Sequence, residues 1–174
     1  LYGINTVCEY FKAKNFSKNK LVVVSPDVGS IKMARAYAYK LGATFAVVDK
    51  QRSSPEKTEV MHILGSVEGK VALLVDDIVA TAGSLVEAAK GLEKKGVTSV
   101  YAGISHGVLS GNALEKVRGC SILKELVITD SIPFKNGKKN PKVKVVSIAS
   151  LLADAIHRIH NEESVSCLFD EIKD

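Results

Sequence analysis

The sequence has no tryptophan, few cysteines and no long apolar run. Because no stretch approaches the roughly 20 apolar residues that a membrane helix needs, we expect no membrane-spanning segment. Cys8, Cys120 and Cys167 lie far apart and form no C-x-x-C pair, which argues against a disulfide framework or a zinc site. We therefore expect isolated thiols and a cytoplasmic location.

The charge balance is moderately basic. The chain of 174 residues has a net charge of +5, with 24 Lys and Arg against 19 Asp and Glu. Such an excess suits a small phosphorylated ligand as well as a polyanion. Because no Arg-rich or aromatic-interleaved stripe accompanies it, we do not expect nucleic acid as a partner. The length is sufficient for one domain with a sizeable core.

The first residues suggest a piece of a longer protein. The chain begins at Leu1 without an initiator methionine and enters a helical pattern directly. Four apolar positions of this pattern share one helix face: Ile4, Val7, Cys8 and Phe11. We therefore expect an N-terminal helix that packs on the rest of the domain.

Short apolar runs alternate with amphipathic helical patterns along the remainder of the chain. The apolar runs predict strands at 21–24, 45–48, 71–75, 100–104, 126–129 and 143–148. The helical patterns cover 31–41, 84–95 and 151–159. The last helix is expected to direct four side chains inward: Leu152, Ala155, Ile156 and Ile159. This alternation predicts an α/β fold, with a mostly parallel twisted sheet and helices on both faces.

Ligands of such sheets bind beyond the carboxyl ends of the strands, so the residues after each apolar run carry the most information. Four loops therefore stand out: 27–30, 49–52, 76–84 and 105–107. His106 in the last loop has two interpretations, a ligand contact or a residue that satisfies neighbouring backbone groups.

The segment VDDIVATAGS, residues 75–84, is the most specific of these signals. Asp76 and Asp77 follow the predicted strand directly. Adjacent carboxylates repel each other and disfavour a low dielectric. A cation or a set of sugar hydroxyls is therefore needed to compensate them.

The rest of the segment supplies the opposite chemistry. Gly83 allows a ligand to approach the backbone closely, and the amides at the start of the predicted helix favour an anion. Thr81, Ala82 and Ser84 complete this loop, and the two hydroxyls add donors. The segment thus offers carboxylates that can accept from sugar hydroxyls and, about one sugar length away, donors that can bind a phosphate. This combination predicts a ribose 5-phosphate site. The alternative interpretation is a helix capped by Ser84 and preceded by two solvated aspartates.

This segment resembles the phosphoribosyl-binding loop of the phosphoribosyltransferase-type fold. Further segments narrow the resemblance: VVVSPDVGSIKMARAYAYKLGATFAVVDKQR, SVEGKVALLVDD, SHGVLSGNALEKV, ELVITDSIP and LLADAIHRIHNEESVSCLF. All of them look like ribose-phosphate pyrophosphokinase, also called phosphoribosyl pyrophosphate synthetase. The resemblance runs from Leu21 to Phe169 and matches the C-terminal half of that family.

The resemblance implies a phosphoribosyltransferase type I-like fold. Residues 1–174 would form the single C-terminal, ribose 5-phosphate-binding domain of a two-domain enzyme of nucleotide biosynthesis. That enzyme transfers diphosphate from MgATP to the C1 hydroxyl of ribose 5-phosphate and yields phosphoribosyl pyrophosphate and AMP. Mg²⁺, ATP and a homo-oligomer (dimer or hexamer) are thereby implied. Because the family's N-terminal half carries much of the ATP site, this chain alone is expected to be inactive.

The resemblance also assigns roles to two cations. Lys50 and Arg52 match the family's catalytic flexible loop, where paired positive charges steady the transferring phosphates. The alternative interpretation is a solvated basic turn. Gln51 lies between them at a position where many members carry a third basic residue, so this loop is weaker in charge.

The resemblance also implies roles for three aspartates and for the loop 81–84. Asp27 in SPDVGS resembles a magnesium-linked carboxylate, and it can equally cap the helix that begins at Ile31. Asp76 and Asp77 would hold the ribose hydroxyls, directly or through a metal. The 5-phosphate would bind at 81–84.

One position departs from the family's pattern. Ala80 stands where synthetases usually carry an acidic residue. An engineered change, natural tolerance and a catalytically impaired relative all account for it. Ala80 and Gln51 together favour a non-catalytic regulatory relative as one alternative function. A phosphoribosyltransferase is the other alternative, although no aromatic-rich insertion supplies the base-recognition region that it needs.

Overall fold

Seven strands form one sheet in the part of the chain that the structure describes. The computed structural model describes residues 1–51, 60–134 and 140–169. In space the strands run in the order β3-β2-β1-β4-β5-β6-β7. Their bounds are β1 (Leu21–Ser25), β2 (Thr44–Gln51), β3 (Val60–Leu64), β4 (Val71–Val79), β5 (Ser99–Gly107), β6 (Leu123–Thr129) and β7 (Val143–Val146). Every neighbouring pair is parallel except β2 and β3, which are antiparallel.

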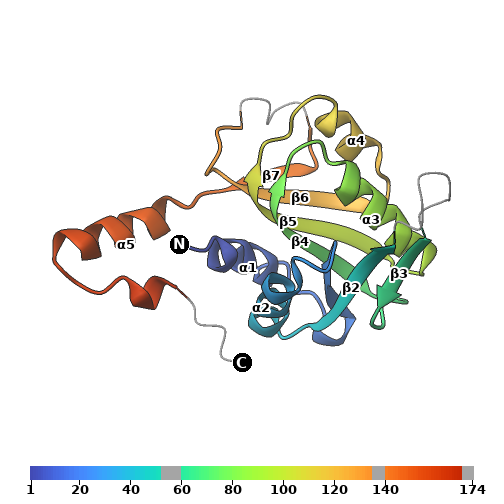
Figure 1. Ribbon diagram of the computed structural model, residues 1–174, viewed down its shortest axis with the longest axis horizontal. Helices are drawn as coiled ribbons and strands as arrows, with labels where there is room; N and C mark the ends of the chain where they lie inside the picture. Colours follow the sequence, from blue (N-terminus) through green and yellow to red (C-terminus); the bar gives the residue numbers. More distant parts are fainter. Residues whose placement is uncertain (52–59, 135–139, 170–174) are drawn as a thin grey trace.

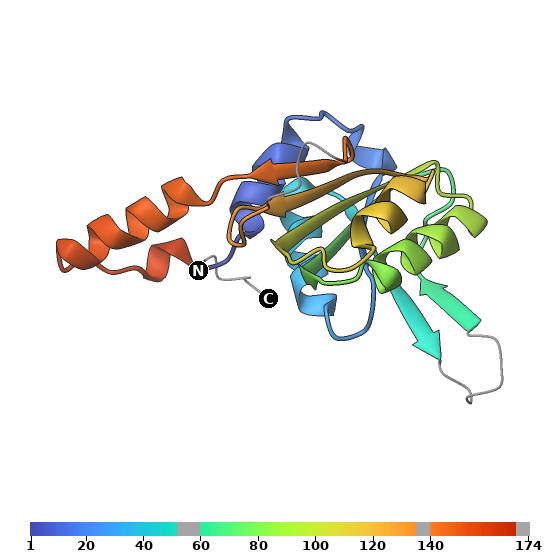
Figure 2. The same ribbon diagram turned by 90° about the horizontal axis from the view of Figure 1, so that it is seen from above.

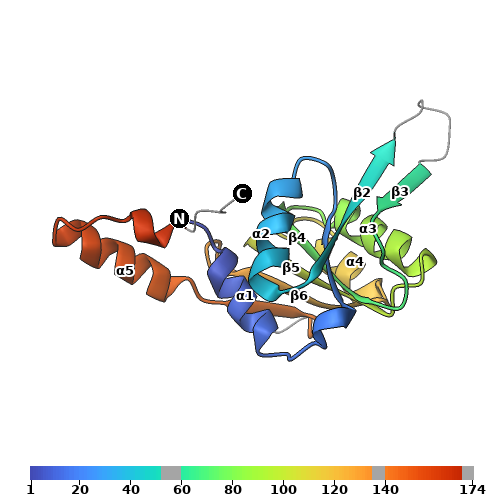
Figure 3. The same cartoon turned by 90° about the horizontal axis from the view of Figure 1, so that it is seen from below.

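Helices cover both faces of this sheet, as the sequence predicts (Figure 1). α1 (Ile4–Lys12) and α2 (Ile31–Leu41) lie on one face (Figure 3). α3 (Gly83–Lys94) and α4 (Ala113–Gly119) lie on the other face. Within the described ranges, no helix is both long enough and apolar enough to cross a membrane.

Two groups of buried apolar side chains form the core, one on each face of the sheet. β1 contributes to both, because Val22 and Val24 join the group beneath α3 and α4. Leu21 and Val23 join the group beneath α1 and α2. Burial of both strand faces explains why this segment is a continuous apolar run. Each such side chain contributes roughly 1.5–3 kcal/mol to stability.

The predicted apolar face of α1 packs on the sheet. Val7 and Phe11 are both buried against β5 at Gly103. A methyl group placed on Gly103 would lie 2.7 Å from Val7 Cγ1 and 3.0 Å from Phe11 Cε2, closer than packing allows. The glycine therefore sets how closely α1 approaches the sheet.

Some elements differ from the sequence-based prediction. α2 has the predicted bounds, and Gly42 ends it in a left-handed conformation with φ of 60°. β2 extends to Gln51, so Lys50 lies in a strand and not in the predicted loop. β3 and α4 were not expected at all. β3 pairs with the end of β2 and lengthens it, and the paired ends extend away from the sheet (Figure 2).

The last helix contradicts its prediction in one respect. α5 (Ala149–His160) forms, but it extends away from the sheet (Figures 1 and 2). Ala155 is its buried residue, whereas Leu152, Ile156 and Ile159 are 44%, 67% and 67% exposed. The 3.6-residue period therefore identifies the helix and its apolar stripe correctly. It does not specify what the stripe packs against, and here that is not the sheet.

Candidate functional site

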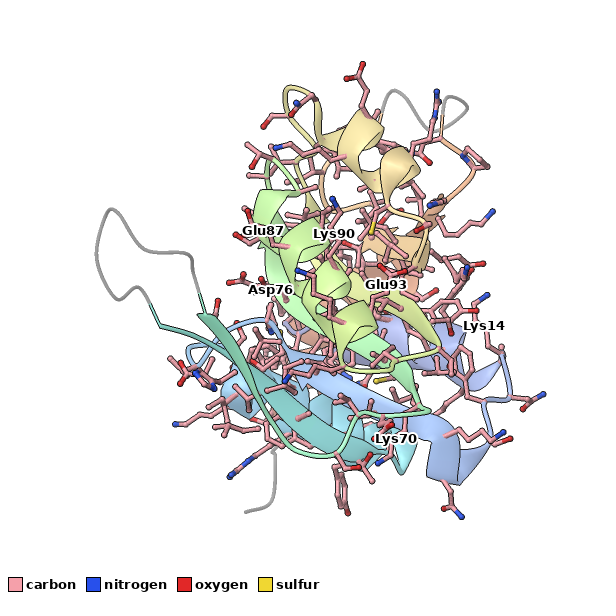
Figure 4. The ribbon with its side chains drawn as sticks, turned by 90° about the vertical axis from the view of Figure 1, so that its right-hand side faces the viewer. Lys14, Lys70, Asp76, Glu87, Lys90 and Glu93 are labelled. Carbon is pink, nitrogen blue, oxygen red and sulfur yellow. The ribbon has the colours of Figure 1, made fainter. Side chains whose placement is uncertain are left out.

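A cavity lies at the carboxyl ends of β1 and β4, with a volume of about 380 Å³. Pro26 and Asp27 after β1, Asp76 and Ile78 of β4, and residues 80–84 line it. The strand order reverses between β1 and β4, and ligands of open α/β sheets bind at such a point. Figure 4 shows Asp76 toward the side from which β2 and β3 extend, opposite Lys14 and Lys70.

The paired acids of the sequence face two different clefts. β4 continues to Val79, so Asp76 and Asp77 lie within the strand and do not follow it. Neighbouring side chains of a strand point to opposite faces. Asp76 lines the cavity beside 80–84, whereas Asp77 is exposed and lines a second cleft. The structure therefore brings Asp76, but not Asp77, together with the loop 81–84.

Asp76 is electrostatically destabilised in the folded chain. Burial raises the pKa of its carboxyl above the ordinary value, and the negative charges of Asp77 and Asp27 act in the same direction. The Ser30 hydroxyl and the Asp77 backbone N–H donate to Asp76 Oδ1 at 3.1 and 3.0 Å, which lowers the pKa. Burial outweighs these two bonds. The site thus favours additional donors or a cation at Asp76.

Asp27 has a structural contact of its own. Its Oδ1 accepts a hydrogen bond from the Ser30 backbone N–H at 3.0 Å, and Ser30 directly precedes α2. Ser30 is the capping residue of α2, so this contact orders the turn before the helix and does not make Asp27 its cap. Because the Ser30 hydroxyl also donates to Asp76, one serine links the loop after β1 to β4.

The loop 81–84 places the first turn of α3 at the wall of the cavity. α3 begins at Gly83, so Ser84 lies in its first turn and is not its capping residue, which corrects the alternative interpretation. The first amides of a helix have no intrahelical partner and carry the positive end of its dipole. The Thr81 and Ser84 side chains are exposed and add hydroxyl donors. This wall of the cavity is suited to an anion.

Ala82 stores backbone strain at this wall. Its φ is 56°, a left-handed conformation that costs a residue with a Cβ about 1 kcal/mol or more. Ala82 is 4% exposed and packs into the core beneath α3, which holds it in place. This conformation turns the chain from β4 into α3 within residues 80–82.

The loop between β5 and α4, together with α4, holds residues 80–81 through hydrogen bonds to their carbonyl oxygens, and the sequence analysis did not identify it. The Ser110 backbone N–H donates to the Ala80 carbonyl oxygen at 2.9 Å. Lys116 Nζ of α4 donates to the Thr81 carbonyl oxygen at 3.3 Å. The available signal was the pair Ala113 and Val117, two buried positions four residues apart in a short helix.

The second cleft has a volume of about 840 Å³ and lies beside the starts of α1 and α2. Asp77, His106 and Ser131 are among its lining residues. His106 Nδ1 and Ser131 Oγ form a hydrogen bond of 2.8 Å. The partner is a side-chain hydroxyl and not a backbone group, so this contact decides neither interpretation of His106.

The remaining predicted residues are a metal ligand and two cations. Among the described residues, no cluster of three or more His, Cys, Asp or Glu side chains could hold a metal ion. Mg²⁺ commonly uses one or two carboxylates, with water and substrate phosphates as the other ligands. Asp27 and Asp76, which repel each other across the cavity, fit that donor set. Arg52 and the side chain of Lys50 lie outside what the structure describes.

Comparison with known proteins supplies the family. The model of the phosphoribosyl synthetase-associated domain matches residues 53–170. The chain belongs to the phosphoribosyl synthetase-associated domain family. The matched segment contains β4, the loop 81–84 and α4, and it therefore includes most of the residues that line the cavity.

Curated relatives of this phosphoribosyl synthetase-associated domain are named ribose-phosphate pyrophosphokinase. The protein of Clostridium acetobutylicum is 46% identical over 171 residues, 98% of this chain and 53% of the relative. That of Caldanaerobacter subterraneus is 49% identical over 169 residues, 97% of this chain and 53% of the relative. The chain thus spans about half the length of the curated relatives that it matches.

Solved structures confirm the predicted α/β fold. Phosphoribosylpyrophosphate synthetase from Mycobacterium smegmatis superposes with a TM-score of 0.82 and 30% identity, over 92% of this chain and 51% of that chain. APRTase from Giardia lamblia superposes with a TM-score of 0.51 and 21% identity, over 69% of this chain and 76% of that chain. The second similarity concerns the fold alone.

Proposed function

We propose that this chain is the ribose 5-phosphate-binding, C-terminal domain of a ribose-phosphate pyrophosphokinase. Such an enzyme transfers diphosphate from ATP to the C1 hydroxyl of ribose 5-phosphate and yields phosphoribosyl pyrophosphate and AMP. One observation carries the proposal: a single cavity has the start of α3 on one wall and the destabilised carboxylate of Asp76 on another. The names of the relatives support the same reaction.

The 5-phosphate binds at 81–84. Backbone amides of the first turn of α3 donate to the phosphate oxygens, and Thr81 and Ser84 add hydroxyl donors. Gly83 lines the cavity, and because it has no side chain a ligand can approach its backbone closely. Phosphate binding here fixes the sugar at one end.

The ribose hydroxyls bind to Asp76. Sugar hydroxyls donate to a carboxylate in charge-assisted hydrogen bonds, which compensates the charge that burial disfavours. The Ser30 hydroxyl holds Asp76 Oδ1 in position. Asp77 faces the second cleft, so its part is the backbone N–H that it donates to Asp76, together with its negative charge.

Mg²⁺ and ATP enter this proposal through Asp27 and the two cations. Magnesium held by Asp27, with Asp76 nearby, would neutralise phosphate charge during the transfer. Lys50 and Arg52 would steady the diphosphate, because such reactions depend mainly on positioning and on electrostatic stabilisation. The rest of the ATP site, the dimer or hexamer and the cytoplasmic location stay predictions.

A non-catalytic regulatory relative is the second candidate function. Ala80 favours it, since its methyl group lines the cavity where the family's pattern has an acid. The two candidates differ in turnover and not in the binding of ribose 5-phosphate.

Titration calorimetry tests the proposed binding directly. The chain is titrated with ribose 5-phosphate, with and without Mg²⁺, and compared with Asp76→Asn and Asp77→Asn. We expect the wild-type chain to bind and Asp76→Asn to lose at least about tenfold in affinity, the effect of one charge-assisted contact. Asp77→Asn should lose less, because its side chain faces the other cleft. A folded wild-type chain that binds no ribose 5-phosphate would contradict the proposal.

A further inference from the structure

α4 brings an ammonium group to the anion-binding wall of the cavity. Lys116 Nζ donates to the Thr81 carbonyl oxygen at 3.3 Å. A methyl group placed on Gly83 would lie 3.7 Å from Thr81 Oγ1 and 3.8 Å from Lys116 Nζ. These are ordinary contact distances, so Lys116 Nζ lies next to Gly83, which lines the cavity, although Lys116 itself is not among the lining residues. A hydroxyl, an ammonium group and the first turn of α3 therefore border the same space.

The contact with Thr81 uses only part of what Lys116 can offer. An ammonium group has three donors, and a backbone carbonyl is a neutral acceptor. Within the described residues, Lys116 forms no ion pair with a carboxylate. Its positive charge is thus not neutralised by a neighbouring acid. An anion bound beside Gly83, within reach of Lys116 Nζ, would supply that compensation.

We propose that Lys116 binds the phosphate of the sugar phosphate, together with the loop 81–84. The inference rests on the proposed function and adds to it a ligand contact from outside that loop. Hydrogen bonds from a charged donor are roughly twice as strong as neutral ones. Lys116 therefore contributes to the preference for ribose 5-phosphate over unphosphorylated ribose. It also makes phosphate recognition depend on the placement of α4.

Calorimetry with three variants tests this role. Lys116→Gln removes the charge, and Lys116→Arg restores it. Lys124→Gln is the matched control, because Lys124 Nζ also donates to a carbonyl, that of Ser121 at 3.2 Å, and its loss changes the net charge equally. Lys124 is the second residue of strand β6, at the opposite ends of the strands from the cavity. The probes are ribose 5-phosphate, inorganic phosphate and ribose.

We expect Lys116→Gln to weaken both phosphate-bearing probes by about tenfold or more. Lys116→Arg should stay within about threefold of wild type, and Lys124→Gln within about twofold. A charge contact is screened by salt, so the salt dependence of the affinity should be flatter in Lys116→Gln. A lysine that only holds the Thr81 carbonyl would leave this dependence unchanged, and that result would overturn the proposal.

The two proposals fail in different ways. In one outcome, ribose 5-phosphate binds, and its affinity falls in Asp76→Asn but not in Lys116→Gln. The proposed role of Lys116 is then wrong and the proposed function stands. If inorganic phosphate binds and depends on Lys116, but ribose 5-phosphate binds no better, then the anion site stands and the sugar site is wrong. If neither phosphate-bearing probe binds the folded chain, both proposals fall.

Gly83→Ala provides an independent test of the same space. The added methyl group fits without a clash, and alanine is favoured over glycine in a helix by roughly 0.5–1 kcal/mol. We therefore expect an unchanged or raised melting temperature and at least about tenfold weaker binding of ribose 5-phosphate. Unaltered affinity would place the phosphate elsewhere and would contradict the role of Lys116.

Discussion

At the scale of single residues, the folded state disfavours the charged form of Asp76 that the proposed function needs. Its folded pKa is raised, chiefly by burial, so the folded state binds the proton more tightly than the unfolded state. The resulting stabilisation is complete below the unfolded pKa of about 4 and is lost as the pH rises through the folded pKa. At neutral pH the ionised side chain therefore lowers the stability of the fold. A ligand that donates to it removes part of this cost.

Asp76→Asn should therefore stabilise the unliganded chain. Asparagine keeps an oxygen for the Ser30 hydroxyl and removes the buried charge. We expect a higher melting temperature at pH 7 to 8 and a difference that shrinks toward zero as the pH falls toward about 4. For a domain of this size, 1 kcal/mol corresponds to a shift of about 2–4 °C. Thermal unfolding across this pH range measures it.

Asp77→Asn is the control for this prediction, because the Asp77 side chain is exposed. At pH 7 to 8 its melting temperature should change less than that of Asp76→Asn. An Asp76→Asn variant that is less stable than wild type at pH 7 would show that the carboxylate is already compensated in the folded chain.

At the scale of elements, burial distinguishes helices that look alike in sequence. α3 and α5 both carry an apolar stripe, but Leu92 of α3 is fully buried and Ile156 of α5 is 67% exposed. α5 is connected to the sheet through Asp130, whose carboxylate accepts from the Ser147 hydroxyl at 2.6 Å and the Ile148 N–H at 2.8 Å. These bonds lower the pKa of Asp130, the Ser147 bond most. Polar contacts thus fix where α5 begins.

Two alanine substitutions test this difference. We expect Leu92→Ala to lower the free energy of unfolding by about 2–5 kcal/mol, because it leaves a cavity beneath α3. Ile156→Ala should change it by less than about 0.5 kcal/mol, because the side chain is largely in solvent. Denaturant unfolding of the 174-residue chain measures both. Equal losses would mean that α5 packs on the body of the protein in solution.

The sequence predicts elements well where one local signal decides them. α2 has a clear apolar face and a glycine at its end, so its bounds are correct. β3 is an edge strand that owes its order to pairing with β2, and α4 is shorter than two full periods of a helical pattern. Neither leaves a strong local signal. For the same reason the sequence indicates Asp76 and the loop 81–84 as candidate site residues, whereas no local pattern indicates Lys116.

At the scale of the whole molecule, the chain covers about half the length of its curated relatives. Binding of the sugar phosphate can be tested on this chain, whereas under the proposed function turnover is measured on a protein of the relatives' full length. Ala80 is the residue whose effect on turnover can be measured only in the longer protein. It lines the cavity, and its position is fixed by a backbone contact, Ser110 N–H to the Ala80 carbonyl, that a new side chain would not disturb.

Ala80→Asp in the complete enzyme should raise turnover. An added carboxylate would give the ribose hydroxyls or the magnesium ion one more oxygen contact, worth about tenfold in rate. Steady-state kinetics with ribose 5-phosphate and ATP measure the effect, and Ala80→Asn controls for side-chain size. Equal or lower activity would contradict the prediction and favour the regulatory candidate.

The position of the cavity between β1 and β4 also bears on how the protein folds. β1 pairs with β4 through Leu21 and Val71, Val22 and Ala72, and the residues that follow, so the chain must close a long loop before these strands meet. Such contacts form late and slowly, because the loop entropy is lost before the pairing compensates it. Asp27 and Asp76 become neighbours only after this closure. A sugar phosphate would therefore bind only chains that have completed their slowest pairing, and it would act as a selective stabiliser of the finished fold.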